Sequence, residues 1–330
     1  MLDIDLAPYR FDFDLTFAVL FMHPDGSILG RYGGRTAENA ESHLSLASLR
    51  TAMDAAREAF AKHVPQKRPP VAPRTIRDSA SFQKRLAGGK VDCVHCHNIN
   101  TAETLDRQAL GLWPEDGLWV FPDPIQLGLT LDRDQQDLIT EVVAGSIADA
   151  AGIRKSDRLQ SVNGERVVTL GDFQWQLNQL PNQQGPVPLE LLRDGQPLSA
   201  SLQLTDQWKK ADPWTYSWRA FKWDLMPAPG FGGPMLSDSQ KQELGLEAGQ
   251  SAFRVQYMVT WGERSRTGRN AAQAGLRQGD IVCSVGGKSD FRNIEHFHSW
   301  FRLTQTPGET VRMEVLREGR PKTLTLPVID

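Results

Sequence analysis

The chain has 330 residues, of which 40% are hydrophobic and 23% are charged, and its formal net charge is −3. This length can hold two or three domains, and the composition is that of ordinary globular proteins. The slightly negative charge argues against a general nucleic-acid binder, so no nucleic-acid partner is expected. The longest apolar run, residues 17–22, is much shorter than the roughly 20 residues of a transmembrane helix, so no membrane-spanning segment is expected.

Residues 1–63 are predicted to contain two strands and a helix. The apolar residues 17–22 indicate a buried strand, and residues 24–26 (Pro-Asp-Gly) favour a turn into a second strand at residues 27–32. A long helix is then expected to end at about His63. The apolar side chains predicted to face the core from this helix are Leu46, Leu49, Met53, Ala56 and Phe60.

Residues 17–34 (FAVLFMHPDGSILGRYGG) resemble the strand–turn–strand in the C-terminal half of thioredoxin-like proteins. The resemblance implies that residues 1–63 are a partial thioredoxin-like unit. The first β-α-β part of that fold and its redox C-x-x-C are missing, so thioredoxin activity is not implied. Because a half-fold leaves a sheet edge uncovered, we expect further residues upstream of Met1, including an export signal.

Residues 93–97 read C-V-H-C-H, in a chain with only three cysteines. C-x-x-C-H is the attachment motif of c-type haem, in which Cys93 and Cys96 bond to the porphyrin and His97 ligates the iron. The motif therefore predicts haem c as a cofactor. The alternatives are a redox dithiol formed by Cys93 and Cys96, a structural metal site, or two ordinary thiols.

A Pro-rich linker at residues 64–80 precedes the segment that carries this motif, residues 81–118. Asn100 followed by Glu103 predicts a helix start, with Asn100 as the N-cap. The segment resembles a minimal cytochrome-c-like insert. Haem attachment normally takes place outside the cytoplasm, so we expect the protein to be periplasmic or otherwise exported.

A further resemblance is carried by residues 145–153 (GSIADAAGI), 157–159 (DRL) and 162–164 (VNG). These phrases are similar to PDZ domains of periplasmic HtrA-like proteases, although Ser156 stands where the family usually has glycine. The resemblance covers residues 119–205 and implies that a peptide C-terminus is bound by strand addition. The residues implied in binding are Leu127, Gly128 and Leu129 in the carboxylate loop, and Phe173 and Leu177 on a helix at residues 170–179.

Residues 270–282 (NAAQAGLRQGDIV) repeat this pattern, and residues 228–330 resemble a second PDZ domain. Its groove helix is expected at residues 293–303. The residues implied in peptide binding here are Phe231 and Gly232 in the loop, and Phe297 and Phe301 on the helix. The connector between the two modules, residues 206–227, is rich in tryptophan and is expected to form a packed seam.

The expected fold class is a multidomain protein with α/β and mostly-β parts. It comprises the partial thioredoxin-like ββα unit, the small helical C-x-x-C-H segment and two PDZ domains. This order resembles thioredoxin-like/PDZ proteins of planctomycete-type bacteria. The resemblance would cover nearly the whole chain and supplies an architecture rather than a reaction.

Two hypotheses for function follow. In the first, an exported redox protein carries haem c beside two peptide-binding modules and serves electron transfer or redox-linked protein quality control. Its partners would be peptide or protein C-termini and a redox partner. In the second, the protein is a non-catalytic PDZ interaction scaffold with a dithiol or structural cysteine pair. No G-x-S-x-G elbow, P-loop or H-E-x-x-H motif occurs, so no catalytic residue is assigned.

Overall fold

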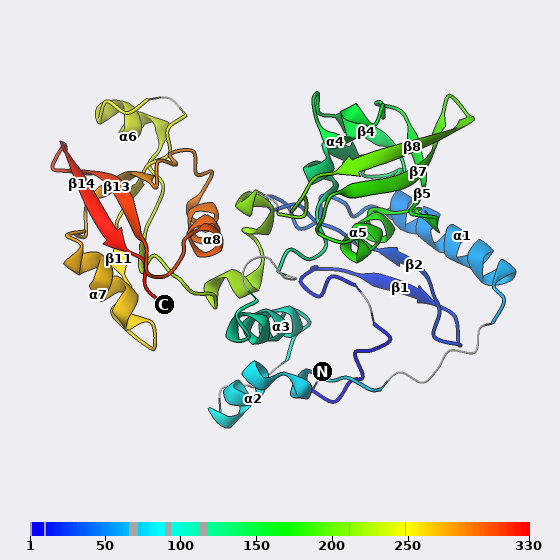
Figure 1. Cartoon of the computed structure of the whole chain (residues 1–330), viewed down its shortest axis with the longest axis horizontal. Coiled ribbons are helices and arrows are strands. Elements are labelled where there is room, and N and C mark those ends of the chain that lie inside the picture. The colour runs from blue at the N-terminus through cyan, green and yellow to red at the C-terminus, as the bar shows by residue number, and fades with distance from the viewer. Residues whose placement is uncertain are drawn as a thin grey trace. The chain divides into compact units, whose positions relative to one another are not determined.

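The computed structural model describes residues 2–9, 11–65, 72–89, 94–112, 118–210, 212–247 and 249–330. The chain divides into two compact units, residues 1–211 (unit 1) and residues 212–330 (unit 2). In Figure 1, unit 1 runs from blue to green and unit 2 from yellow-green to red. No helix among the described residues has both the length and the apolar character that crossing a membrane requires.

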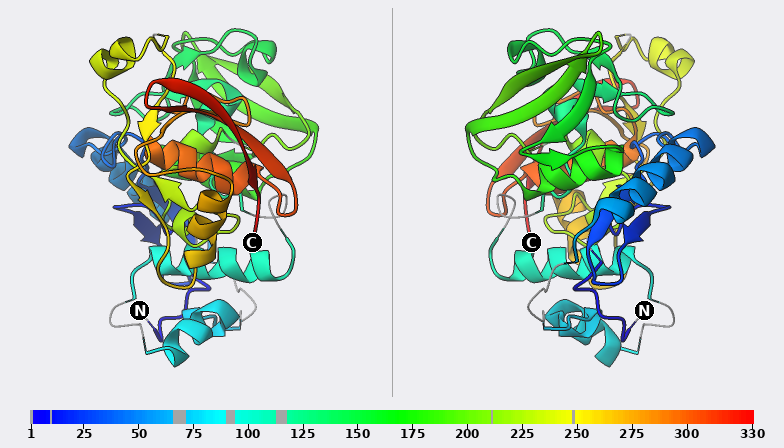
Figure 2. Two further views of the ribbon diagram at one scale, coloured as in Figure 1. Left: turned by 90° about the vertical axis from the view of Figure 1, so that its left-hand side faces the viewer. Right: turned by 90° about the vertical axis from the view of Figure 1, so that its right-hand side faces the viewer.

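Unit 1 begins with a β-hairpin and a helix. The strand β1 (Val19–Met22) pairs antiparallel with β2 (Ile28–Tyr32), and α1 (Leu46–Lys62) follows. The two strands and the turn between them are confirmed. The strand β2 lies next to both α1 and a later helix, α5 (Leu170–Gln179), as Figures 1 and 2 show. The thioredoxin-like identity of this part stays a prediction.

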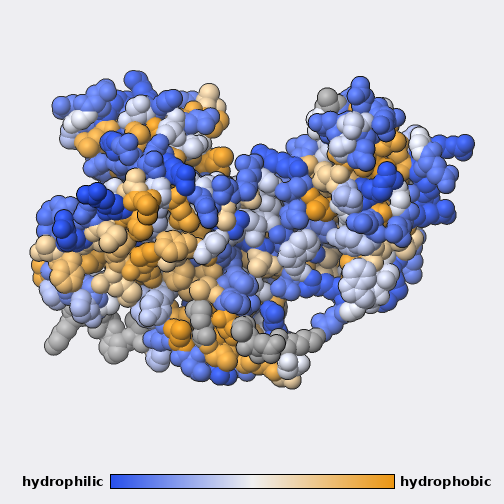
Figure 3. All heavy atoms as spheres, turned by 180° about the vertical axis from the view of Figure 1, so that it is seen from behind, coloured by the Kyte–Doolittle hydropathy of each residue, from blue (hydrophilic) through white to orange (hydrophobic). Residues whose placement is uncertain are grey.

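The face of α1 that packs inward differs from the one predicted. Its buried residues are Ser48, Ala52 and Ala56, whereas Leu46 is 87% exposed. Tyr32 Oη lies 3.0 Å from Ser48 Oγ, so the helix approaches the hairpin through small side chains and a hydroxyl pair. The expected apolar stripe is confirmed at Ala56 and in part at the half-buried Leu49, and it is wrong at Leu46, Met53 and Phe60. These three exposed side chains add to a surface on which hydrophilic and apolar residues are mixed (Figure 3).

Part of the β2 edge, at Arg31, is covered within unit 1. The Arg31 N–H donates to Asp172 Oδ1 at 2.8 Å, and the Arg31 carbonyl accepts a hydrogen bond from Thr169 Oγ1. The Arg31 guanidinium also lies 4.1 Å from the centre of the Trp175 ring. Asp172 on α5 and its N-cap Thr169 thus form hydrogen bonds with the N–H and carbonyl of Arg31, which a further strand could otherwise bind.

Two short helices follow in unit 1. After the 3₁₀ turn η1 (Ile76–Asp78), α2 (Ala80–Ala87) packs against α3 (His97–Ala109). They share a small apolar core whose buried members are Leu6, Phe13, Ile76, Phe82, Ile99 and Ala102. This core is separate from the larger one formed by the rest of unit 1.

The rest of unit 1 is built on two small antiparallel sheets around one core. The first pairs β3 (Leu129–Leu131) with β4 (Ile139–Val142), and the second has the order β6–β5–β7–β8. The other elements are η2 (Pro124–Leu127), α4 (Ile147–Ala150), β5 (Arg158–Val162), β6 (Glu165–Arg166), β7 (Gly185–Arg193) and β8 (Gln196–Leu204). The predicted helix at residues 170–179 and the closing hairpin are confirmed.

Unit 2 has a similar plan. A two-stranded sheet pairs β9 (Phe231–Gly232) with β11 (Tyr257–Met258), and a second sheet has the order β10–β12–β13–β14. The other elements are η3 (Pro213–Tyr216), η4 (Ala220–Trp223), α6 (Asp238–Glu243), β10 (Phe253–Arg254), α7 (Ser265–Gln273), β12 (Ile281–Val285), α8 (Ile294–Thr304), β13 (Thr310–Arg317) and β14 (Arg320–Pro327).

The tryptophans of the connector belong to both units. Trp208 is buried in the core of unit 1, where its Nε1–H donates to the Pro181 carbonyl at 2.8 Å. In unit 2, η3 and η4 pack against α8. Trp214 contacts His296 and Trp223 contacts His298, with ring centres 5.7 and 5.0 Å apart.

Candidate functional site

The loop before β3 requires a glycine at position 128. Gly128 ends η2 with φ of 83°, a conformation that costs other residues free energy. A Cβ at this position would lie 2.2 Å from the Ser146 side chain. The Gly128 carbonyl accepts the N–H of Val143 at 2.9 Å, which fixes the entry into β3. The predicted carboxylate loop is therefore a turn whose backbone conformation requires glycine at position 128.

The apolar side chains predicted to face a peptide in unit 1 are brought together in one core. Leu127, Phe173 and Leu177 have no exposed surface, and Leu129 has 1%. They line the inside of the loop, of β3 and of α5. Their role in peptide binding stays a prediction.

Sequence reasoning missed Asp172, which organises the start of α5. Its carboxylate accepts hydrogen bonds from the N–H groups of Thr169, at 3.2 Å, and Arg31, at 2.8 Å. Burial raises the pKa of Asp172 above its ordinary value, although the hydrogen bond from Arg31 opposes this. The signal was present in the sequence, because Thr169 and Asp172 have the spacing of a capping box.

In unit 2, Gly230 occupies the position that Gly128 has in unit 1. Its φ is 78°, and its carbonyl accepts the N–H of Val259 at 2.7 Å, as that of Gly128 accepts Val143. A Cβ on Gly230 would lie 2.3 Å from the carbonyl carbon of Thr267. The sequence pointed instead to Gly232, which lies two residues further on in β9.

Gly232 lies beside polar side chains of unit 2. A Cβ there would meet Tyr257 Oη at 2.5 Å and His298 Nε2 at 2.9 Å. The other predicted residues, Phe231, Phe297 and Phe301, are buried in the core of this unit. Phe231 and Phe297 have ring centres 5.6 Å apart, so the structure joins the predicted loop to the predicted helix.

The face of α8 that packs against η4 holds a buried pair of basic residues, His298 and Arg302. Arg302 Nη1 lies 3.1 Å from His298 Nδ1, and these residues are 4% and 3% exposed. Burial lowers the pKa of Arg302 to about 9 and that of His298 well below its ordinary value. Among the described residues, no ion pair joins Arg302 to a carboxylate, and neither Arg302 Nε nor His298 Nε2 has a hydrogen-bond partner.

Both units contain the same clamp between an aspartate and an arginine. Arg193 Nε lies 2.8 Å from Asp157 Oδ1, and Arg317 Nε lies 2.8 Å from Asp280 Oδ1. Burial would raise the pKa of each aspartate, but the hydrogen bonds from its arginine and a nearby backbone N–H lower it overall. Arg193 also donates to the carbonyl of Gly152, just after α4, and Arg317 to that of Gly275, just after α7. The repeat that the sequence shows is thus also present in the structure, as the same aspartate–arginine clamp in each unit.

The C-x-x-C-H segment is described in part, since Cys93 lies outside the described residues. Cys96 is the N-cap of α3 and His97 is its first residue. The exposed rings of His95 and His97 are stacked, with centres 5.6 Å apart. The helix starts before Asn100, which is buried within it, so the predicted N-cap is wrong. Instead, Asn98 Oδ1 accepts the N–H of His95 at 2.8 Å.

Comparisons with known proteins agree with this geometry. Residues 126–204 match the family model of the PDZ domain. The chain is 28% identical over 206 residues to the periplasmic pH-dependent serine endoprotease DegQ of Escherichia coli (strain K12), which covers 60% of this chain and 40% of DegQ. It is 24% identical over 208 residues to a probable periplasmic serine endoprotease DegP-like of Marinomonas sp. (strain MWYL1), covering 61% and 39%.

Two solved structures are similar at low identity. The serine endoprotease from Yersinia pestis has 21% identity and a TM-score of 0.25, covering 31% of this chain and 35% of that chain. The HtrA-type protease AlgW with decapeptide has 12% identity and a TM-score of 0.25, covering 54% and 57%. The chain contains a PDZ domain, as the family match at residues 126–204 shows. It is distantly homologous to periplasmic HtrA-like serine proteases, and it spans about two fifths of the curated relatives' length.

Proposed function

We propose that the PDZ domain of unit 1 binds the C-termini of peptides or proteins by strand addition along β3. The observation that carries this is the strand's second edge. Within the described part of the chain, β3 pairs with β4 alone, directly after the turn at Gly128. An added peptide strand would extend this sheet, and its carboxylate would meet the loop at residues 126–129.

Binding of labelled peptides with free C-termini to the full chain tests this proposal. We expect apolar last residues to be preferred, with micromolar affinity, about −8 kcal/mol. The same peptides with a C-terminal amide should bind at least tenfold more weakly. Gly128→Ala should reduce binding, whereas Gly195→Ala is the matched control, because Gly195 also has positive φ and lies in open space. Equal binding of amidated peptides would overturn the assignment.

Unit 2 supplies the second peptide-binding module of this proposal. Support comes from its glycine turn at Gly230 and its Asp280–Arg317 clamp, which repeat those of unit 1. Phe231, Gly232, Phe297 and Phe301 remain the predicted contacts. The segment formed by η3 and η4 packs against α8, where the Trp223 ring lies 5.4 Å from the Arg302 guanidinium.

We also propose that haem c is attached at Cys93 and Cys96, with His97 as the iron ligand. The described residues fit this group, because His97 is exposed in the first turn of α3 and Cys96 directly precedes it. Cys96 is half-buried against the apolar core that Ile99 joins, whereas the His97 side chain is exposed. When bound, haem would supply one-electron transfer, which is the basis for a redox partner and for redox-linked protein quality control.

Mass spectrometry of protein exported in a host with a cytochrome maturation system tests the haem proposal. The expected mass is that of the polypeptide plus one covalent haem. Cys96→Ala should weaken attachment, and His97→Ala should change the Soret spectrum through loss of the proximal ligand. An unmodified mass would favour the scaffold alternative with a dithiol or structural cysteine pair. Export itself is supported by the periplasmic names of the two curated relatives.

A further inference from the structure

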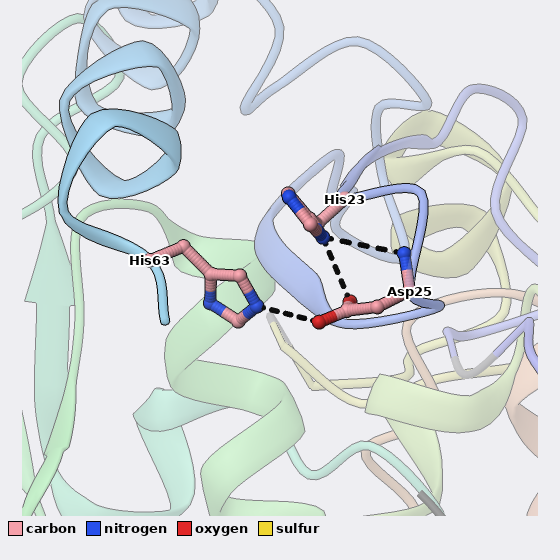
Figure 4. Close-up of side chains that lie close together, drawn as sticks. All are labelled: His23, Asp25 and His63. Carbon is pink, nitrogen blue, oxygen red and sulfur yellow. Dashed lines mark hydrogen bonds and ion pairs between the residues drawn. The ribbon is translucent and has the colours of Figure 1, made fainter. Parts of the chain in front are cut away.

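A cluster of two histidines and an aspartate lies far from the peptide loops, where the β1–β2 turn meets the end of α1 (Figure 4). His23 Nδ1 is 3.0 Å from Asp25 Oδ1, and His63 Nε2 is 2.8 Å from Asp25 Oδ2. The three side chains are 14–15% exposed. One ligand atom from each lies within 4.8 Å of the others.

The backbone holds these ligands in place. The His23 N–H donates to the Ser27 carbonyl at 2.8 Å and the Gly26 N–H to the His23 carbonyl at 2.9 Å, which puts His23 and Asp25 on one tight turn. His63 is the C-cap of α1, where its N–H donates to the Phe60 carbonyl at 3.2 Å. The Phe60 ring packs 5.0 Å from that of His23. A turn and a helix end therefore position the ligands.

The hydrogen bonds of the turn bring two acceptor atoms, His23 Nδ1 and Asp25 Oδ1, close together. His23 Nδ1 accepts the Asp25 N–H at 3.2 Å, so this nitrogen is unprotonated, and a bound cation would take over the lone pair that this long hydrogen bond uses. Asp25 Oδ1, which accepts the Ser27 N–H at 2.8 Å, lies 3.0 Å from the same nitrogen. Two acceptor atoms at this distance repel each other unless a cation or a proton is shared between them. The negative end of the α1 dipole near His63 favours a cation as well.

We propose that His23, Asp25 and His63 bind one divalent transition-metal ion, with zinc as the best match. Imidazole nitrogens and a carboxylate oxygen are the donors that zinc takes, at about 2.0–2.2 Å, which places neighbouring ligand atoms about 3.3 Å apart. The two separations from Asp25 to the histidines, 3.0 and 2.8 Å, are within about 0.5 Å of this spacing. Three protein ligands leave a fourth position for water or a donor from another molecule. The ion would tie the β1–β2 turn to the end of α1.

Metal binding by the full chain tests the proposal, using Cys93→Ser/Cys96→Ser protein so that neither haem nor thiolate metal binding contributes. Cobalt titration should give one equivalent with visible bands of a four- or five-coordinate ion and no thiolate charge-transfer band. Isothermal titration with zinc should give the same stoichiometry. His63→Gln, His23→Gln and Asp25→Asn should each weaken zinc binding at least tenfold, whereas His95→Gln, the exposed control, should leave it unchanged.

Thermal unfolding gives a second measurement of zinc binding, which is needed if a variant folds poorly. Zinc should raise the melting temperature of the Cys93→Ser/Cys96→Ser protein, because it binds the folded state, and should not raise that of the His63→Gln form of the same protein. The proposal is overturned if the serine protein binds no zinc at micromolar concentration. It is also overturned if His23→Gln and His63→Gln leave the affinity unchanged.

Discussion

The two PDZ-like modules share their backbone plan, but the helices α5 and α8 carry different side chains at matching positions. Both place a positive-φ glycine before the first strand, and both close with an aspartate–arginine clamp. The helices α5 and α8 begin after the N-caps Thr169 and Asn293 and bury phenylalanines at matching positions. These shared features set the fold that the two modules have in common.

One matched pair of positions shows the difference clearly. In unit 1, Asn178 on α5 accepts the Phe121 N–H at 2.9 Å through its side chain. The matching position on α8 is Arg302, a buried cation that contacts His298 and the Trp223 ring. Asn178 is uncharged, and its side-chain oxygen has a backbone partner. A buried guanidinium without a carboxylate partner among the described residues carries a desolvation cost that the neutral amide does not.

The largest expected effect comes from replacing the positive-φ glycine that both modules share. Gly230→Ala would place a Cβ against the backbone of Thr267 and force positive φ on alanine. We expect the free energy of unfolding of unit 2 to fall by about 3–5 kcal/mol. Gly128→Ala should cost about 1 kcal/mol less, because its clash is with the Ser146 side chain. Chemical denaturation measures both, and an unaffected Gly230→Ala protein would refute the equivalence of the two turns.

Removing the clamp aspartate should have similar effects in the two modules. Asp280→Ala and Asp157→Ala each delete charge-assisted hydrogen bonds from a nearly buried carboxylate, so each should lower the free energy of unfolding by about 2–3 kcal/mol. Asp238→Ala, at an exposed ion pair in unit 2, is the control. A large effect in only one module would show that the clamps are not equivalent.

Acid should weaken unit 2 through His298. Its folded-state pKa is lowered by burial, while the unfolded chain takes up a proton near pH 6.5. Stability is therefore present above pH 6.5 and is lost as the pH falls, by up to about 1.4 kcal/mol per pH unit. His43 acts likewise in unit 1, where burial and Arg133 lower its pKa to about 4. His298→Gln should flatten the pH dependence between pH 7 and 5; an unchanged slope would contradict this.

Arg302→Met tests whether the buried charge costs stability. An apolar side chain of similar length removes the desolvation penalty, so the free energy of unfolding should rise by about 1–2 kcal/mol. Asn178→Met, its counterpart in unit 1, should instead destabilise, because the Phe121 N–H loses its acceptor. Destabilisation by Arg302→Met would mean that the guanidinium is structurally satisfied.

The smallest effect concerns Ser156, which has φ of 76° where unit 2 has Gly279 with φ of 92°. Ser156→Gly should raise the free energy of unfolding by about 0.5 kcal/mol, because relief of backbone strain slightly exceeds the added entropy of the unfolded chain. Gly279→Ser should lower it by a similar amount. Thermal denaturation distinguishes the two, and shifts of the same sign would contradict the equivalence of these positions.

Local patterns predicted most of the fold, and contacts between distant segments account for what was missed. The helix at residues 170–179 followed from the resemblance to PDZ domains, and the turns from their glycines. Gly230 could not be chosen over Gly232, because the requirement comes from Thr267 on α7. The inward face of α1 depends on Tyr32, and the metal cluster depends on the approach of His63 to the β1–β2 turn.

Hydrogen exchange of the full chain tests the central claim, strand addition along β3, most directly. With a saturating peptide that has a free C-terminus, the account predicts slower exchange of the amides at residues 126–131. The amidated peptide at the same concentration should leave these amides nearly unchanged. Binding that protects other segments but not residues 126–131, or equal protection by the amidated peptide, would contradict the account.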